Sequence, residues 1–165
     1  MVEMHLAAVR VELPTNQPVL LLEELGEGKR TLPIYIGPAE AQAIAYSLQG
    51  VVTSRPMTHD LIRDLLVDLG ASVECVVITE LREGTFYAEI RMVSNGQRHT
   101  VSARPSDAVA LAVRVDCTIY ADDALVDAEG YQLDTNETDD HGEADELVSE
   151  FRQFIEGLRP EDFEG

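Results

Sequence analysis

The spacing of hydrophobic residues predicts two groups of strands, one within residues 4–36 and one within residues 73–120. Apolar and polar residues alternate over residues 4–13, a two-residue period typical of a strand with one buried face. Similar apolar or alternating runs predict further strands over residues 19–22, 32–36, 73–81, 85–93, 97–103 and 117–120. Asn95 and Gly96 separate two of these runs and predict a tight hairpin, so residues 73–103 are expected to form a β-meander.

Apolar residues at helical spacing predict three helices among these strands. The first begins at Pro38 and stops at Gly50, and the second begins at Thr58 or Asp60. The expected buried side of the second helix consists of Leu61, Ile62, Leu65, Leu66 and Leu69. The third begins at Pro105 and is apolar all round, which predicts a helix buried on every side. Together these elements predict an α+β fold: a mixed, largely antiparallel sheet with a β-meander, packed against about three helices and followed by an acidic C-terminal tail.

The acidic residues are concentrated in the C-terminal part of the chain. Residues 121–165 hold 16 of the acidic residues and two basic ones, so most of the net charge of −19 lies there. We therefore expect a domain over residues 1–125, an acidic, disordered linker over 126–142 and an acidic tail over 143–165. The tail contains a predicted short amphipathic helix near residues 144–158, whose apolar stripe is Leu147, Phe151, Phe154, Ile155 and Leu158. This tail is a candidate to dock on the domain or to bind a basic partner.

Composition limits the function classes. No basic footprint of the kind that grips nucleic-acid phosphates is present, and tryptophan is absent, which argues against a base-stacking platform. Cys75 and Cys117 lack metal-ligand spacing and are expected to be reduced core thiols. The N-terminus does not resemble a signal peptide, and no stretch reaches the roughly 20 apolar residues that cross a bilayer. We expect a soluble, cytoplasmic protein without a membrane partner.

Polar residues gather at the three predicted helix starts, where free N–H groups and the helix dipole attract anions. These residues are Glu40, Arg55, Thr58, His59, Asp60, Arg104, Ser106 and Asp107. The arginines could bind a phosphate, and His59 could act as a general base. The three carboxylates could hold Mg²⁺ or Mn²⁺, which prefer oxygen ligands. If the starts converge, they supply the parts for metal-assisted phosphodiester hydrolysis.

Simpler roles exist for the same residues. Aspartate, serine and threonine at helix starts are usually caps, and an arginine beside an aspartate is often a structural ion pair. Other catalytic templates are missing from the sequence: it has no glycine-rich phosphate loop, no Gly-x-Ser-x-Gly turn and no His-Glu-x-x-His motif. From the residues alone, the prediction stops at a mixed α/β domain with a candidate site for an anion or a metal.

Four motifs resemble those of the bifunctional nuclease family. They are Leu-Pro-Ile-Tyr-Ile-Gly at 32–37, Arg-Pro-Met-Thr-His-Asp-Leu at 55–61, Gly-Thr-Phe-Tyr-Ala at 84–88 and Ala-Arg-Pro-Ser-Asp-Ala-Val-Ala-Leu-Ala at 103–112. Their order and spacing agree over about residues 4–125. The resemblance implies an α+β fold, self-association as a homodimer or higher oligomer, and DNase and RNase activity on nucleic acid. It also favours the polar helix starts as the site.

Two functions follow. The first is weak, low-specificity, metal-dependent hydrolysis of DNA and RNA, in which His59, Asp60, Asp107 and Glu40 are catalytic. Asp60, Asp107 and Glu40 would also hold the metal, while phosphate would be bound by Arg55, Arg104, Thr58 and Ser106. The alternative is a non-enzymatic binding or regulatory module whose helix starts are structural or bind a small anion. A shared metal site requires Glu40, Asp60 and Asp107 to converge, so their geometry discriminates between the two.

Overall fold

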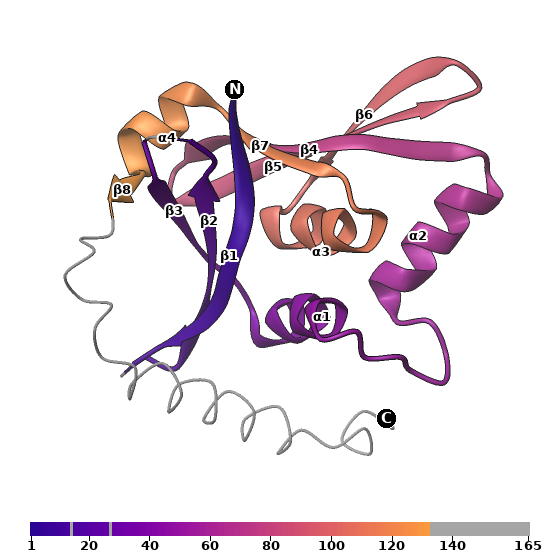
Figure 1. Ribbon diagram of the computed structural model, residues 1–165, viewed down its shortest axis with the longest axis horizontal. Coiled ribbons are helices and arrows are strands. Elements are labelled where there is room, and N and C mark those ends of the chain that lie inside the picture. Colours follow the sequence, from indigo (N-terminus) through magenta and orange to yellow (C-terminus); the bar gives the residue numbers. More distant parts are fainter. Residues whose placement is uncertain (14, 27, 133–165) are drawn as a thin grey trace.

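The computed structural model describes residues 1–13, 15–26 and 28–132, in which the chain forms eight strands and four helices (Figure 1). The strands are β1 (Val2–Glu12), β2 (Gln17–Glu24), β3 (Arg30–Tyr35), β4 (Ala71–Arg82), β5 (Thr85–Ser94), β6 (Gln97–Ala103), β7 (Thr118–Ala121) and β8 (Tyr131–Gln132). The helices are α1 (Pro38–Leu48), α2 (Thr58–Asp68), α3 (Pro105–Val115) and α4 (Asp123–Glu129). The predicted α+β class is confirmed.

All eight strands belong to one sheet, in the order β6-β5-β4-β7-β1-β2-β3-β8. Only the β4–β7 pair is parallel among the described strands, so the sheet is mixed and largely antiparallel as predicted. Asn95 and Gly96 both have positive φ, at 51° and 74°, which is the backbone of a two-residue hairpin turn between β5 and β6. The predicted β-meander is therefore β4, β5 and β6.

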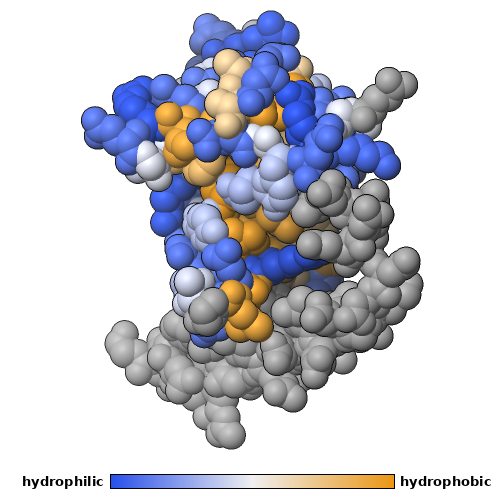
Figure 2. Space-filling view, turned by 90° about the vertical axis from the view of Figure 1, so that its left-hand side faces the viewer, coloured by the Kyte–Doolittle hydropathy of each residue, from blue (hydrophilic) through white to orange (hydrophobic). Residues whose placement is uncertain are grey.

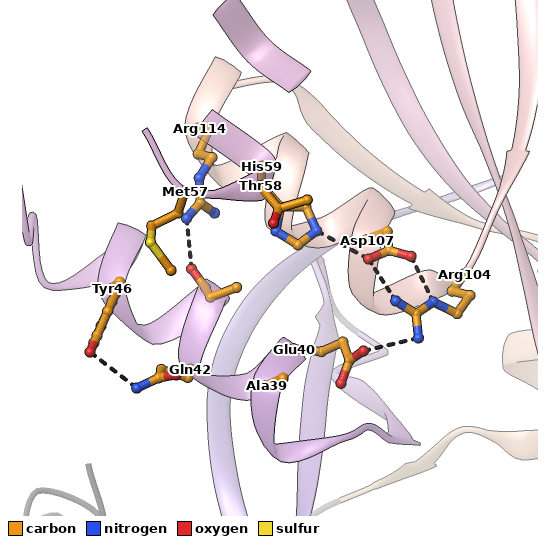
Figure 3. A pocket seen from close by; sticks show the side chains of 11 residues that line it. Ala39, Glu40, Gln42, Tyr46, Met57, Thr58, His59, Arg104, Asp107 and Arg114 are labelled. Atoms are coloured by element: carbon orange, nitrogen blue, oxygen red, sulfur yellow. Dashed lines mark hydrogen bonds and ion pairs between the residues drawn. The ribbon is translucent and has the colours of Figure 1, made fainter. Parts of the chain in front are cut away.

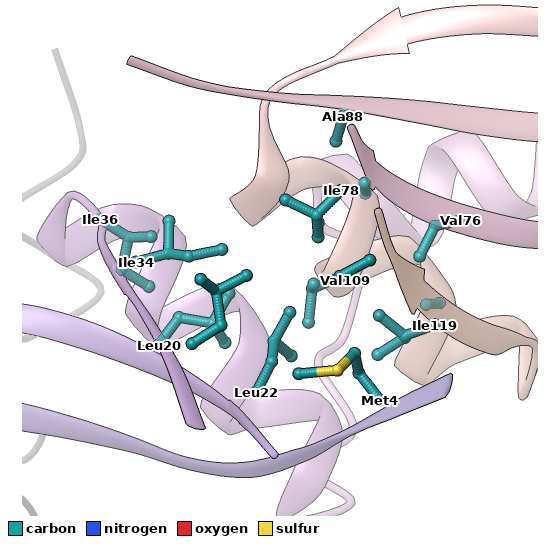
Figure 4. Packing of buried hydrophobic residues seen from close by; sticks show 14 of the residues in the cluster. Met4, Leu20, Leu22, Ile34, Ile36, Val76, Ile78, Ala88, Val109 and Ile119 are labelled. Atoms are coloured by element: carbon teal, nitrogen blue, oxygen red, sulfur yellow. The ribbon is translucent and has the colours of Figure 1, made fainter. Parts of the chain in front are cut away.

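Helix α3 lies in the angle between the two halves of the sheet, β4, β5 and β7 on one side and β1, β2 and β3 on the other (Figure 1). Residues Ala108 to Ala112 of this helix are at most 1% exposed, which confirms the prediction of a helix buried on every side. Its side chains meet residues from both halves of the sheet, among them Leu20 and Leu22 of β2 and Val76 and Ile78 of β4 (Figure 4). This core fixes the start of α3, and with it Arg104 and Asp107.

The prediction for α2 is wrong in one respect: the side expected to be buried is largely exposed. Of the five residues on that side, the exposed ones are Leu61 at 50%, Ile62 at 38%, Leu65 at 50% and Leu69 at 72%. Helix α2 lies at the edge of the molecule, where it contacts α3 and β4 (Figure 1). Periodicity reports which residues share a face of a helix, but it does not report whether another element covers that face.

The fold continues past residue 125, into the segment predicted to be a linker. Asp122 caps α4 by accepting a hydrogen bond from the Ala124 N–H at 2.9 Å. Arg30 then ties α4 to the sheet, because it pairs with Asp127 and makes two hydrogen bonds with Glu24, at 2.8 and 2.9 Å. The rest of the predicted linker, 133–142, and the tail, 143–165, lie outside the described residues.

Two further expectations concern the cysteines and the membrane. Cys75 and Cys117 are both free and half-buried, and burial raises the pKa of the Cys117 thiol to about 11. Across the described part of the chain, none of the helices has the length and apolar character needed to span a bilayer.

Candidate functional site

The starts of α1, α2 and α3 meet at one pocket with a volume of about 290 Å³ (Figure 3). Eleven residues line it: Ala39, Glu40, Gln42, Ala43, Tyr46, Met57, Thr58, His59, Arg104, Asp107 and Arg114. Local sequence explains why the helices begin here. Pro38 and Pro105 occupy the first helical turns of α1 and α3, where the missing N–H costs nothing. Each of the three helices also has an acidic residue in its first turn, which complements the positive end of the helix dipole.

Asp107 is the centre of a polar cluster in this pocket. Its Oδ1 lies 3.0 Å from His59 Nε2, and its two oxygens accept hydrogen bonds from Arg104 at 2.7 and 3.1 Å. The third nitrogen of Arg104 pairs with Glu40 Oε1 at 2.9 Å. The chain of contacts from His59 through Asp107 and Arg104 to Glu40 therefore joins all three helix starts (Figure 3).

The contacts between Asp107 and Arg104 favour the charged forms of both side chains. Burial disfavours the charged form of Asp107, but hydrogen bonds from Arg104 and His59 outweigh it and hold the pKa of this carboxyl below its usual value. The bonds to Asp107 likewise raise the pKa of Arg104. The imidazole of His59 is only 10% exposed, whereas the side chain of Arg104 is 65% exposed. A ligand can thus reach the guanidinium without unfolding the site.

Asp60 belongs to a different set of contacts. Its Oδ1 accepts a hydrogen bond from Arg114 Nε at 2.6 Å, and its Oδ2 accepts one from the Met57 N–H at 3.0 Å. Burial opposes ionisation of Asp60, but the bonds from Arg114 and Met57 prevail and lower the pKa of the carboxyl. Asp60 is therefore both a cap of α2 and the partner of a buried arginine.

Arg114 was not singled out by the sequence. Its side chain is 4% exposed, and besides Asp60 it donates to the carbonyl oxygens of Ala110 at 2.8 Å and Ala43 at 2.9 Å. One guanidinium thus fastens α1, α2 and α3 together at the floor of the pocket. The available signal was an arginine in the last turn of a helix whose residues from Ala108 to Val113 are all apolar.

The eight predicted site residues are therefore only partly brought together. The pocket contains Glu40, Thr58, His59, Arg104 and Asp107. Asp60 is outside the lining and pairs with the lining residue Arg114. Ser106 is 6% exposed and is also outside the lining. Arg55 is exposed on the loop before α2, where its backbone carbonyl accepts a hydrogen bond from Thr53, and it is likewise outside the lining.

The proposed metal ligands do not form a ready-made cation site. Arg104 stands between Glu40 and Asp107 and pairs with both, while Asp60 is paired with Arg114. Among the described residues, no group of three or more His, Cys, Asp or Glu side chains is arranged to hold a metal ion. In this arrangement the donors do not fit Mg²⁺ or Mn²⁺, because a guanidinium already occupies the position between the carboxylates.

Comparison with known proteins assigns the family. The model of the bifunctional nuclease domain matches residues 19–134, which include all three helix starts. The chain belongs to the bifunctional nuclease domain family. Bifunctional nuclease 2 of Oryza sativa subsp. japonica is 25% identical over 118 residues, which cover 69% of this chain and 36% of that protein. Bifunctional nuclease 2 of Arabidopsis thaliana is 25% identical over 127 residues, which cover 73% of this chain and 38% of that protein.

A bacterial relative is more similar along its whole length. A protein of Mycobacterium tuberculosis strain H37Rv, described as uncharacterized, is 46% identical over 164 residues. The match covers 98% of this chain and 97% of that protein. The resemblance read from the four sequence motifs is therefore confirmed at the level of the family.

Proposed function

We propose that this bifunctional nuclease domain hydrolyses nucleic-acid phosphodiesters at the pocket formed by the starts of α1, α2 and α3. One observation carries the proposal: Asp107 contacts both a histidine and an arginine in a pocket onto which three helix N-termini open. Helix N-termini and an exposed guanidinium together favour a phosphate group. A histidine held by a carboxylate is a suitable general base.

The arrangement assigns a role to each residue. Arg104 binds a phosphate oxygen, and Glu40 and Asp107 hold its guanidinium in place. With a proton on Nε2 shared with Asp107, His59 keeps a lone pair on Nδ1 that can remove a proton from a water molecule. As that water forms a bond to phosphorus, the bond to the leaving oxygen breaks, and Asp107 stabilises the imidazolium that results. Solvent then carries the proton from the imidazolium to the released alkoxide, which restores neutral His59. No step here passes through a metal ion, since the donors present do not fit one.

The proposal is tested with purified full-length protein and fluorogenic DNA and RNA oligonucleotides. His59→Gln should lower the cleavage rate about 100-fold, the usual contribution of a general base. His99→Gln is the matched control, because His99 is exposed on β6, outside the pocket lining. A second pair is Arg104→Gln against Arg98→Gln, whose guanidinium side chain is 84% exposed. Activity that survives in both pocket variants would refute the proposed site.

Metal dependence is a separate arm of the same assay. Activity that persists after EDTA treatment supports a reaction carried by the side chains alone. Activity that disappears with EDTA and returns with Mg²⁺ or Mn²⁺ requires Arg104 to release Glu40 or Asp107, and would show that the arrangement described here is not the reactive one.

The alternative is a non-enzymatic module that binds a small anion in the same pocket. Two observations favour it: Arg104 is already paired with two carboxylates, and the chain carries a net charge of −19, which repels nucleic acid. Binding of inorganic phosphate that depends on Arg104, in protein that cleaves neither DNA nor RNA, would decide for the module.

A further inference from the structure

Strand β2 is buried on both of its faces, although the helices cover only one. Leu20 and Leu22 point into the core shared with α1, α3 and α4. Because side chains alternate along a strand, Val19 and Leu21 point to the opposite face. These two side chains are nevertheless only 9% and 6% exposed, and neither belongs to the core cluster.

The neighbours of Val19 and Leu21 define an apolar surface on this outer face. Pairing with β3 places Tyr35 beside Val19 and Pro33 beside Leu21. We call Val19, Leu21, Pro33 and Tyr35 the outer strip. Figure 2 views the molecule from the side of β1, β2 and β3 and shows hydrophobic surface between hydrophilic margins. The Tyr35 side of the strip is open, because Tyr35 is 50% exposed.

No helix within the described residues covers the outer strip. Ile44 of α1 and Val126 of α4 join the cluster that contains Leu20, so both helices pack on the inner face of the sheet. The low exposure of Val19 and Leu21 is a property of the single chain, so the cover comes from the chain itself.

The chain leaves the described structure beside this strip. Strand β8 pairs with β3 through Thr31 and Tyr131, and Tyr131 also lies close enough to influence the ionisation of Tyr35. Residues 133–165 follow directly. An extended chain covers at most about 3.5 Å per residue, so the segment from Gln132 to Leu147 reaches up to about 50 Å. This far exceeds the roughly 5 Å between neighbouring strands, so the tail can reach every position on the strip.

The tail also has the composition that such a surface requires. Three of the four phenylalanines of the chain lie in residues 133–165, although this segment carries 12 acidic residues. Two of them, Phe151 and Phe154, share a predicted helical stripe with Leu147, Ile155 and Leu158. An apolar stripe on an otherwise acidic segment needs a surface to bury against.

We propose that residues 144–158 form an amphipathic helix that packs its apolar stripe on the outer strip of the same chain. The acidic side of this helix faces water, and Arg10, which the pairing with β1 places beside Val19, provides a basic contact at the margin. The tail is then part of the fold of the domain, and its apolar side is not free to bind a partner.

Photo-crosslinking in the full chain tests the contact. A benzoylphenylalanine at position 35 should capture a peptide within residues 144–158 upon illumination. The matched control is the same probe at position 65, because Leu65 is also 50% exposed but lies on α2. A mixture of ¹⁵N-labelled and unlabelled protein separates links within one chain from links between chains.

The outcomes are decisive. Links from position 35 to residues 144–158 within one chain support the proposal. Tail peptides captured from position 65 instead, links mainly between chains, or no tail peptide from position 35 would each overturn it.

A fluorescence measurement provides an independent check. The chain has no tryptophan, so Phe154→Trp introduces a single reporter. Acrylamide should quench this reporter less in the native protein than in urea. Tyr35→Ser should weaken docking about tenfold and restore quenching, since it removes an aromatic contact, whereas Leu65→Ser should not. Equal quenching in native protein and in urea would contradict the proposal.

Discussion

Arg114 offers the sharpest test of what holds the site together. We consider Arg114→Met, which keeps much of the length of the side chain but removes three contacts: the ion pair with Asp60 and hydrogen bonds to two carbonyl oxygens. The side chain of Arg114 is 4% exposed and that of Asp60 is 24% exposed. The substitution therefore leaves a largely buried carboxylate without its partner.

The cost follows from this burial. Breaking a buried ion pair by removing one partner costs about 3 to 5 kcal/mol, and the quarter of the Asp60 surface that stays in water favours the lower end. We therefore expect the free energy of unfolding to fall by about 3 kcal/mol. With an unfolding entropy of about 2.1 cal/mol/K per residue, the melting temperature should fall by about 10 °C.

Urea denaturation followed by circular dichroism measures this loss, and Arg63→Met is the matched control. Arg63 pairs with Asp64 on the surface of α2 at 2.7 Å, with side-chain exposures of 38% and 44%. Such pairs contribute about 0.5 kcal/mol or less. A double-mutant cycle with Asp60→Asn should show a coupling energy of about 2 kcal/mol. If Arg114→Met and Arg63→Met lower the free energy of unfolding by the same amount, then Arg114 does not hold the three helices together as described.

Three further predictions concern acid stability, self-association and a turn. The pKa values of Asp60 and Asp107 are lower in the folded chain than the unfolded value of about 3.9. Their contribution to stability is therefore complete above about pH 3.9 and is lost as the pH falls through the folded pKa values. Asp107→Asn should reduce this loss of stability in thermal unfolding measured over a series of acidic pH values. The exposed apolar side of α2 predicts that the protein self-associates and that Leu65→Glu weakens this association. A sedimentation coefficient of the wild type that does not change over a range of concentrations would contradict this prediction. Gly96→Val should lower the free energy of unfolding by about 1 kcal/mol or more, because φ is 74° at this position and valine disfavours a positive φ. An unchanged free energy of unfolding in urea denaturation would show that the turn adapts.

Much of the fold could be predicted because its signals are local. Pro105 followed by an apolar run specifies the start and burial of α3, and Asn95-Gly96 specifies a hairpin between alternating runs. Short elements escaped prediction: α4 and β8 have few residues, and β8 is held by pairing with β3, which lies about 100 positions earlier. Pairing between strands so far apart in the sequence cannot be predicted from the local pattern of apolar and polar residues.

The site was predictable as a set of helix starts but not as a set of contacts. His59 and Asp107 are 48 positions apart, and Asp60 and Arg114 are 54 apart, so no local pattern indicates which aspartate meets which cation. In the sequence, Asp60 and Asp107 occur in similar positions, each after an Arg-Pro pair at a predicted helix start. The structure distinguishes them, because α2 directs His59 into the pocket (Figure 3). Asp60, on the same helix, pairs with Arg114 instead.

Asp107 provides the most direct test of the proposed site, because it contacts both His59 and Arg104. The measurement is the rate at which full-length Asp107→Asn cleaves fluorogenic DNA and RNA, beside the wild type and the exposed control Asp64→Asn. Replacing the carboxylate that orients a catalytic histidine lowers rates by up to about 10⁴-fold. We predict that Asp107→Asn loses at least about 100-fold while Asp64→Asn keeps the wild-type rate. A folded Asp107→Asn protein that cleaves as fast as the wild type would contradict the account.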